Sequence, residues 1–511
     1  MKRFILLLSA FIVFGSCYIS EVQAQQQWDW HIAGGTIIDG TGGKPYQADI
    51  LVRGDSIAFV GPLDPDTVRA QKNVDASGKV VTPGFIDPHA HGNPLETPGF
   101  HNFLAMGITT IVLGQDGSSP AVGELDDWLA KVEEANPTVN IAMLSGHGSI
   151  RAKVNVGKQN PTRQELKRMH RLLKADLQDG AFGMSTGLEY VPGMYAAEEE
   201  LKRMAAIVGE NDGIVMSHMR SEDDSDMEAS LDELAQQGEF SNVHVSHLKV
   251  VYGEGEKRAE EILNYIDRFR EQGITMTADI YPYSASFTGI GIVFPDWAKT
   301  EDEWKNALQE RPEVLRRFLK DKVEQRNGAD AILFGSGDYT GLSLKEAAER
   351  EKVSPVDLLI KMGPEAASAA HFVMDQALQD RLLMGGKVMV SSDGSPTMRH
   401  PRGYGSFAKI IRYYVNEKEL LSLEEAIYKM SGLPAKTLGL NDRGFIREGQ
   451  KADLLIFDRE EIEDRATFEH PHKLAEGFNW IMVNGTHVRG DGEFNKVTSG
   501  RLLKGKGASK K

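Results

Sequence analysis

Hydrophobic residues follow two different patterns along the chain, and each pattern occupies its own region. Between residues 30 and 79, short β-like runs such as "WHIAGGTIID" and "ADILVRGDSIAFVG" are broken by Gly, Asp and Pro, which is typical of hairpins. The same texture returns after residue 444, where Asn484-Gly485 indicates a tight turn. Two β-rich segments at opposite ends most simply meet in one small sheet. We therefore predict that residues 28–80 and 441–505 form the two parts of one β-sandwich domain.

The region between these ends predicts a barrel. Apolar runs alternate there with longer helical patterns such as "ELKRMHRLLKADLQ", which is typical of repeated βα units around a parallel sheet. Eight runs qualify as buried strands: "KVVTPGFID", "TTIVLG", "NIAMLSGH", "AFGMS", "GIVMSH", "VHVSH", "TMTADI" and "KVMVSSD". The fold class predicted is α/β, a (β/α)8 TIM barrel over residues 81–440. A ninth run, "AILFGSG", is placed in an insertion at about residues 289–335, before the eighth strand.

The composition is that of an ordinary globular protein, and it limits the chemistry. With 511 residues, of which 41% are hydrophobic and 26% charged, the chain can bury a large core. Its net charge of -16 argues against nucleic acid or an anionic membrane surface as a partner, because both need clustered Lys and Arg. Cys17 is the one cysteine, so no intramolecular disulfide can form, and any metal must be held by histidines and carboxylates.

The first residues predict export. Lys2 and Arg3 precede an apolar stretch and then a polar one, which is the pattern of a secretory signal peptide and is too short to span a membrane as a mature helix. Val22 and Ala24 favour cleavage after residue 24, which predicts a periplasmic or secreted protein. The stretch "FGSC" also resembles a bacterial lipoprotein box, so a lipid anchor at Cys17 is the alternative.

The stretch "VVTPGFIDPHAHGNP" places His89 and His91 one residue apart at the end of an apolar run. Residues i and i+2 of a strand face the same side, so both imidazoles should point into the barrel mouth, where barrel enzymes keep their active sites. An isolated pair of this kind is more often structural than functional. His218, His247 and Asp393, however, each follow another apolar run directly, and ligand types that converge from several strand ends indicate a metal site.

These residue types predict hydrolytic chemistry. Neutral imidazoles suit zinc, and an open coordination position lowers the pKa of a bound water to about 7. Asp393 would be the general base that orients this water and later delivers a proton to the leaving group, and the alternative for Asp393 is an N-cap of the following helix. His147 in "SGHGSIR" would line the same mouth, but a lone histidine is equally consistent with a structural role.

At these residues the chain resembles a known family. "PGFIDPHAH", the histidines after strands five and six and the "SDG" after strand eight are similar to the amidohydrolase superfamily of metal-dependent barrel hydrolases. The likeness runs from about Ile32 to Gly505, because "GFIREGQKADLLIFD" and "VNGTHVRGDG" resemble the superfamily's flanking β domain. Five further motifs resemble the N-acyl-D-amino-acid deacylases, or D-aminoacylases: "MSTGLEYVPG", "SHMRSE", "SHLK", "DIYPYSAS" and "HPRGYGSF".

The resemblance implies a reaction and a set of roles. The reaction is hydrolysis of the amide of an N-acyl-D-amino acid to a carboxylate and the free D-amino acid, by metal-activated water, with Asp393 as the acid/base. His218 and His247 would bind the tighter zinc, while His89 and His91 would contribute to a second or weaker metal position. The residues implied for substrate binding are Lys249, Tyr190, Tyr283 and Arg402.

Elementary chemistry agrees with part of this assignment. A planar guanidinium can pair bidentately with a substrate carboxylate, and a lysine adds a point charge. The alternative for Lys249 and Arg402 is an ordinary surface salt bridge.

One departure from the family concerns the metal. D-aminoacylases commonly carry a Cys ligand after the second strand, whereas this chain reads "TTIVLGQDGSSP" and offers Asp116. A carboxylate can bind or bridge zinc in that place, so we predict a change of ligand type, with Glu189 as the second choice. Harder ligands also admit Mn2+ or Co2+ in place of Zn2+. The sequence does not decide between one and two bound metal ions.

Two other functions compete with this assignment. Another amidohydrolase, acting on a cyclic imide or amide or on a dipeptide, would share the metal residues but should lack the paired context of Tyr283 and Arg402. A secreted binding protein on a decayed barrel would need missing ligands, and none of the histidines is missing. The side-chain preference, the acyl-group preference and the oligomeric state are not determined by the sequence.

Overall fold

The computed structural model describes residues 27–64 and 68–510. The predicted signal peptide at residues 1–24 lies outside these ranges, and so does Cys17, the site of the alternative lipid anchor. Among the described helices, none has the length and apolar character needed to cross a membrane.

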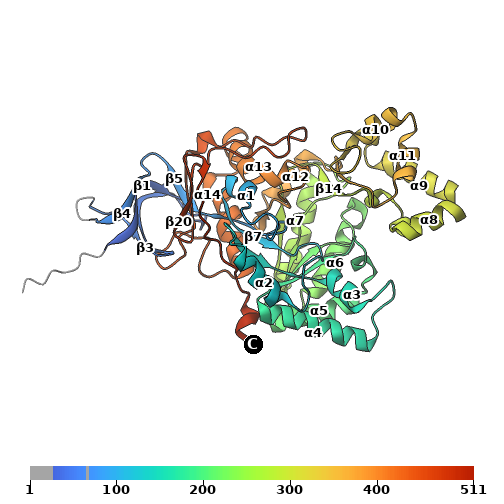
Figure 1. Ribbon diagram of the computed structural model, residues 1–511, viewed down its shortest axis with the longest axis horizontal. Coiled ribbons are helices and arrows are strands. Elements are labelled where there is room, and N and C mark those ends of the chain that lie inside the picture. Colours follow the sequence, from blue (N-terminus) through green and yellow to red (C-terminus); the bar gives the residue numbers. More distant parts are fainter. Residues whose placement is uncertain (1–26, 65–67, 511) are drawn as a thin grey trace, which may run out of the picture.

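Strands from both ends of the chain build one nine-stranded sheet. Its order is β21-β20-β19-β18-β5-β1-β2-β3, and β4 pairs with β1. The N-terminal strands are β1 (Trp28–Ile37), β2 (Tyr46–Arg53), β3 (Ser56–Gly61), β4 (Ala70–Asp75) and β5 (Val80–Pro83), and the C-terminal ones are β18 (Leu454–Phe457), β19 (Trp480–Val483), β20 (Thr486–Gly490) and β21 (Glu493–Phe494). β5 and β18 join the two halves in antiparallel register. The prediction that the two segments meet in one sheet is confirmed (Figure 1).

The middle of the chain forms the predicted barrel. Parallel pairs connect β6 (Phe85–Asp87), β7 (Ile108–Leu113) and β8 (Asn140–Met143), and a second series connects β9 (Ser145–Gly146), β10 (Gly183–Gly187), β11 (Ile214–His218), β12 (Asn242–Val245), β13 (Met276–Ile280) and β17 (Val388–Val390). β8 and β9 are successive pieces of the third strand. The ring closes where Ala90 bridges Gly394 in parallel and the Asp393 N–H donates to the His89 carbonyl at 2.9 Å.

Helices cover the outside of this ring (Figure 1). They are α1 (His101–Ala105), α2 (Leu125–Glu134), α3 (His147–Val154), α4 (Arg163–Asp179), α5 (Glu198–Glu210), α6 (Met227–Gln237), α7 (Gly255–Glu271), α12 (Gln376–Leu383), α13 (Arg402–Lys409), α14 (Leu423–Ile427) and α15 (Leu433–Leu438). In α4, a capping box between Thr162 and Glu165 starts the helix, and Met169, Leu173 and Leu177 at four-residue spacing bury one face. Local sequence therefore determines both where this helix begins and which side faces inward.

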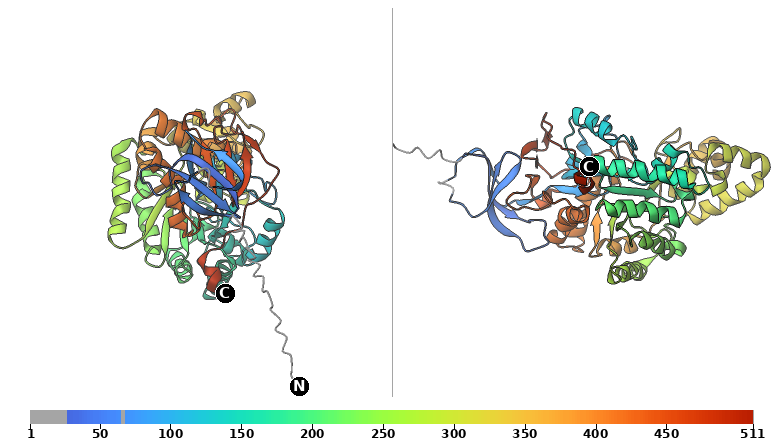
Figure 2. Two further views of the ribbon diagram at one scale, coloured as in Figure 1. Left: turned by 90° about the vertical axis from the view of Figure 1, so that its left-hand side faces the viewer. Right: turned by 90° about the horizontal axis from the view of Figure 1, so that it is seen from below.

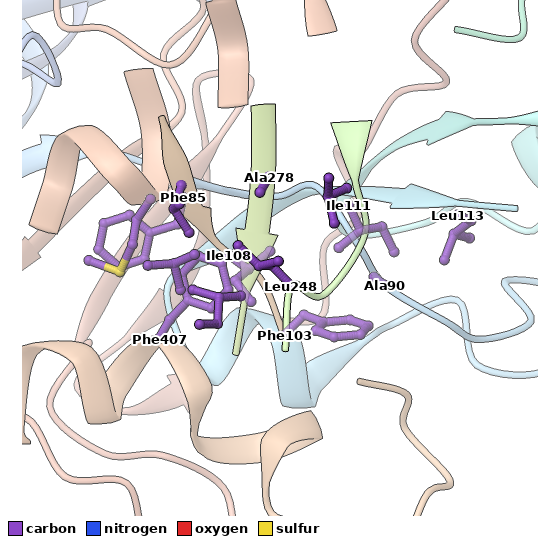
Figure 3. Close-up of a cluster of buried hydrophobic side chains, with 14 of the residues drawn as sticks. Phe85, Ala90, Phe103, Ile108, Ile111, Leu113, Leu248, Ala278 and Phe407 are labelled. Atoms are coloured by element: carbon purple, nitrogen blue, oxygen red, sulfur yellow. The ribbon is translucent and has the colours of Figure 1, made fainter. Parts of the chain in front are cut away.

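The barrel core draws side chains from several elements. Phe85 on β6, Ile108 on β7, Ala278 on β13 and Phe407 on α13 belong to one buried cluster (Figure 3). The Phe85 and Phe407 rings stack with their centroids 5.8 Å apart. Because the strands pack closely against each other and against α13, the polar residues at the strand ends are held in place.

The first predicted barrel strand is divided between two sheets, which corrects the sequence interpretation. Of "KVVTPGFID", residues 80–83 form β5 in the terminal sheet and residues 85–87 form β6 in the barrel. Gly84 lies at the break, where a Cβ would collide with the side chain of Thr109. An apolar run shows that a segment is buried, but it does not show which sheet buries it.

The excursion before the last barrel strand is longer than predicted. The excursion contains a three-stranded antiparallel sheet in the order β14 (Ser286–Gly289), β16 (Ser368–His371) and β15 (Ile332–Phe334). Four helices lie between β14 and β16 in the sequence: α8 (Glu301–Glu310), α9 (Pro312–Gln325), α10 (Leu344–Glu351) and α11 (Pro355–Met362). The run "AILFGSG" contains β15, as predicted. The excursion spans residues 286–371 rather than 289–335, because β16 pairs with both of the other strands. Figure 2 shows its helices at the opposite end of the molecule from the terminal sheet.

Candidate metal centre and active site

The structure brings the predicted strand-end residues together. His89 and His91 follow β6, Asp116 follows β7, His218 ends β11, His247 follows β12 and Asp393 follows β17. All six stand at the carboxyl ends of barrel strands. Their side chains form two groups, each compact enough to hold one metal ion: His89, His91, Asp116 and Asp393 in one, and Asp116, His218 and His247 in the other.

Asp116 belongs to both groups. Its Oδ2 lies 3.4 Å from His91 Nε2 and its Oδ1 lies 3.2 Å from His247 Nε2. Within the second group, His247 Nε2 is 2.9 Å from His218 Nδ1. The two oxygens of one carboxylate therefore face different histidines, which is the geometry of a bridging ligand.

The donor set fits a divalent cation. His89 is completely buried, and neither of its ring nitrogens has a hydrogen-bond partner, although buried polar groups are nearly always paired. Its ring centroid lies 4.8 Å from that of His247. Four imidazoles and two carboxylates are ligand types that suit zinc and similar ions, and a bound cation would give His89 its missing partner.

Three of these residues adopt the left-handed backbone region. The φ angles are 53° at Asp116, 37° at His247 and 46° at Asp393. Non-glycine residues rarely adopt such angles, which cost on the order of 1–3 kcal/mol each and concentrate at functional sites. The backbone thus aims side chains that regular strand geometry would direct elsewhere.

Electrostatics also favour a cation here. Burial alone would raise the pKa of Asp116, but the nearby rings of His89 and His247 lower it well below its ordinary value. Burial and Lys249 would lower the pKa of His247, yet the carboxylates of Asp116 and Glu222 raise it to about 9. The carboxylates are therefore ionised and attract positive charge to the centre of the site.

Asp393 is held by an arginine. Arg402 Nη1 lies 2.8 Å from Asp393 Oδ2, and both side chains are buried. The other oxygen, Oδ1, lies 3.1 Å from His91 Nε2 and 3.7 Å from His89 Nε2. Burial would raise the pKa of Asp393, but Arg402 and His91 lower it below the ordinary value. The carboxylate is thus ionised, with one oxygen fixed and the other facing the ligand group.

A buried network beneath the ligands was not found from the sequence. Asp279 Oδ1 accepts the His247 N–H at 3.0 Å, and its Oδ2 lies 2.7 Å from His244 Nε2. Asp87 accepts hydrogen bonds from the Ser392 N–H and hydroxyl, which ties β6 to β17. Supporting carboxylates of this kind orient metal ligands. Asp87 lies two residues before His89 in the sequence, and this proximity was the available signal for it.

His147 belongs to a structural ion pair instead of the site. Its Nε2 lies 2.8 Å from Glu200 Oε1, and Arg151 Nη1 lies 2.5 Å from Glu200 Oε2. All three side chains are buried and connect α3 to α5. Of the two roles that the sequence left open for this residue, the geometry favours the structural one.

A cavity of about 250 Å³ opens directly onto the ligands. Its walls include His91, Asp116, His218, His247 and Asp393, together with the predicted substrate residues Tyr190, Lys249 and Arg402. Lys249 is 3% exposed, and its Nζ lies 2.6 Å from Glu222 Oε1. The cavity therefore combines the ligand groups with cationic side chains that could hold an anion.

Tyr190 and Glu189 flank the second ligand group. The Tyr190 ring centroid lies 4.5 Å from that of His218, and burial raises the pKa of its hydroxyl well above 10, so that it stays protonated. Glu189 Oε2 lies 3.2 Å from His218 Nε2, on the ring edge opposite His247. The geometry favours Asp116 over Glu189 as the carboxylate ligand, because Asp116 faces histidines of both groups.

Tyr283 does not lie with Lys249 and Arg402, which corrects the sequence interpretation. Its ring packs against Lys409, whose Nζ is 4.2 Å from the ring centroid. Tyr281 lies near both cations instead, with its ring centroid 4.7 Å from Arg402 Cζ and 5.9 Å from Lys249 Nζ. The Tyr283 N–H donates to the Tyr281 carbonyl at 3.0 Å. This tight i→i+2 turn breaks the strand alternation.

Arg326 is a cavity residue that the sequence did not single out. It follows α9 in the excursion, lines the cavity and is 4% exposed. Its Nη1 donates a long 3.4 Å hydrogen bond to the Tyr252 hydroxyl, and its Nε has no partner. Within residues 27–64 and 68–510, no carboxylate lies within ion-pair distance of its guanidinium. Nothing in the local sequence distinguishes it from the arginines of α9.

The chain matches one family model over most of its length. The model is described as "Amidohydrolase family" and covers residues 72–289 and 328–491. The gap at residues 290–327 falls within the excursion and includes Arg326.

Curated relatives and solved structures give the same picture. N-acyl-D-glutamate deacylase of Alcaligenes xylosoxydans xylosoxydans is 33% identical over 91% of this chain and 94% of its own length. D-aminoacylase of the same organism is 32% identical over 94% and 98%. The structure of N-acyl-D-glutamate deacylase from Bordetella bronchiseptica, complexed with zinc and a phosphonate inhibitor, has a TM-score of 0.82 at 31% identity and covers 94% of this chain and 100% of its own. A D-aminoacylase structure with a binuclear metal center scores 0.80 at 30% identity, with 93% and 100% covered.

Proposed function

The chain belongs to the amidohydrolase family, and on this premise we propose that it hydrolyses the amide bond of N-acyl-D-amino acids to a carboxylate and the free D-amino acid. The observation that carries the proposal is the arrangement around Asp116. Two ligand groups share this carboxylate at the barrel mouth, and they open onto a cavity with cationic side chains. The relatives named above, similar over more than nine-tenths of the chain, support the stereochemical part.

The proposed cofactor is zinc, as one or two ions, with Mn2+ or Co2+ as substitutes. The residues that would hold it are His89, His91, Asp116, His218 and His247. When bound, such an ion polarises a carbonyl and lowers the pKa of water to about 7.

Asp393 supplies the proton transfer. Its Oδ1 faces the ligand group while Arg402 holds Oδ2, so one oxygen remains available to a water and to the substrate. In our proposal it accepts the proton of the attacking water and then donates it to the amide nitrogen that leaves. The Arg402 ion pair keeps this carboxyl ionised before the reaction.

The remaining polar side chains position the substrate. Lys249, Arg402 and Arg326 line the small cavity, and a substrate carboxylate placed there gains charge-assisted hydrogen bonds. The protonated Tyr190 hydroxyl, at the border of the ligand groups, can donate a hydrogen bond to the carbonyl oxygen as negative charge develops on it.

A stereochemical panel tests the proposal. Purified protein supplied with zinc is assayed on N-acetyl-D- and N-acetyl-L-amino acids and on cyclic imides. We expect turnover of D-forms only. Turnover of L-forms or cyclic imides without D-forms would assign the chain to a different amidohydrolase activity.

A variant tests the role of Asp393. Asp393→Asn should abolish hydrolysis while zinc content, measured by atomic absorption, stays nearly that of the wild type. Loss of zinc as the main defect would make Asp393 primarily a metal ligand.

A further inference from the structure

A second, larger cavity adjoins the site. It has a volume of about 540 Å³ and shares His91, Asp116 and Tyr190 with the smaller cavity. Its other walls include the apolar side chains of Leu113, Trp128, Met143, Ala152, Val191 and Pro192. We propose that this cavity receives the acyl group of the substrate, and that the preferred substrates carry acyl groups much larger than acetyl. The inference rests on the proposed function.

The charges on the two cavities determine the direction of the substrate. In an N-acyl amino acid, the carboxylate and the acyl chain lie on opposite sides of the amide that is cleaved. The smaller cavity carries Lys249, Arg326 and Arg402 beside several carboxylates. Lys249 pairs with Glu222 and Arg402 with Asp393, so among the described residues Arg326 is the cavity cation without an ion pair. None of the described residues that line the larger cavity is lysine or arginine. The carboxylate therefore belongs in the smaller cavity, where it can be paired. With the amide at the three shared residues, the acyl chain must extend into the larger cavity.

The volume then determines the size of the acyl group. Cavities of about 300–1,000 Å³ are typical of drug-sized ligands. At about 30 Å³ per water molecule, the larger cavity holds on the order of fifteen to twenty waters, and the single methyl group of an acetyl substrate would displace only about one. A long apolar chain would displace most of them. Each buried methylene should then raise kcat/KM by about three- to fourfold.

Part of the cavity wall is closely packed backbone, which favours a preformed space. Three glycine-containing segments pack backbone to backbone around it: a Cβ on Gly187 would collide with the Asp116 carbonyl, and one on Gly148 would lie 2.9 Å from the Gly117 carbonyl. Such close contacts leave no room for the walls to collapse onto a small acyl group. A small acyl group would consequently leave water in the cavity.

The experiment compares acyl lengths on one D-amino acid. N-acetyl, N-butyryl and N-octanoyl derivatives of the best D-amino acid from the stereochemical panel are assayed with the wild type and with Ala152→Trp. Ala152 is an exposed residue of α3 at the cavity wall, so an indole there fills space without disturbing the core. Lys153→Trp is the matched control. The Lys153 side chain is exposed next to Ala152 on the same helix, and it does not line the cavity.

For the wild type we expect kcat/KM to rise at least about 50-fold from acetyl to octanoyl, which corresponds to three buried methylenes. Ala152→Trp should lower the octanoyl-to-acetyl ratio of kcat/KM at least tenfold, while Lys153→Trp leaves this ratio unchanged. A wild type that prefers acetyl, or a ratio that Ala152→Trp leaves unchanged, would overturn the inference.

Calorimetry of acyl derivatives binding to Asp393→Asn distinguishes failure of the cavity assignment from failure of the proposed function. Octanoyl derivatives that bind at least tenfold more tightly than acetyl ones, without any turnover by the wild type, would keep the cavity assignment and remove the deacylase activity. Equal binding of both would remove the cavity assignment.

Discussion

Replacing Arg326 by methionine should make the protein more stable and less active. Arg326 is 4% exposed as a residue. Its guanidinium has no ion-pair partner among the described residues and makes one long hydrogen bond to Tyr252. An isolated buried charge costs several kcal/mol, and apolar replacement of buried charges of similar volume is neutral or stabilising. We expect Arg326→Met to raise the free energy of unfolding by about 1–3 kcal/mol.

The same variant should lose substrate binding. A hydrogen bond to a charged group contributes about 1.5–3 kcal/mol, so losing the pair with a substrate carboxylate should reduce kcat/KM by about 10- to 150-fold. N-acyl-D-glutamate and N-acyl-D-glutamine are assayed side by side. A loss confined to the glutamate derivative assigns Arg326 to a side-chain carboxylate, and an equal loss assigns it to the α-carboxylate.

Arg443 is the matched control for the stability part. It is equally buried, but its Nη1 lies 2.6 Å from Asp453 Oδ2, a carboxylate that is itself buried. Arg443→Met leaves that charge without its partner and should cost about 3–5 kcal/mol. Urea unfolding of the two variants measures both effects. A destabilised Arg326→Met, together with unchanged kcat/KM, would mean that Arg326 has a structural role, and the reasoning would be wrong.

Three other outcomes follow from the structure. Asp116→Ala should weaken metal binding at both ligand groups, whereas His91→Ala should weaken it at one. Zinc titration with a competing chelator distinguishes the two variants. An Asp116→Ala protein that binds as much zinc as the wild type would contradict a shared ligand. Burial lowers the pKa of Lys429 from 10.5 to about 8, so between pH 8 and 10.5 the unfolded chain binds more protons and the stability contribution of this lysine rises with pH. The unfolding free energy of the wild type relative to Lys429→Met should therefore rise by up to about 3 kcal/mol across that window, and parallel curves would exclude this assignment. We also propose that the chain is exported, so mass spectrometry of the mature protein should find Gln25 as the first residue, whereas a lipidated Cys17 would support the anchored alternative.

Local patterns in the sequence were sufficient for the architecture and for most of the site. Strand-like apolar runs that end in His or Asp predicted both the barrel and the residues at its mouth. This works because the carboxyl ends of parallel strands in a closed barrel face one opening, so residues far apart in the sequence need no other signal to meet. His89, His218, His247 and Asp393 are examples.

Tertiary structure alone decided the features that depend on distant partners. The position of Asp116 between two groups of histidines, the i→i+2 turn that selects Tyr281 over Tyr283, and the approach of Arg326 from the excursion all arise from contacts that no local period encodes. Apolar periodicity reports burial of a segment, but charge pairing and the direction of a side chain beyond a strand end are determined by the chain segments packed against it.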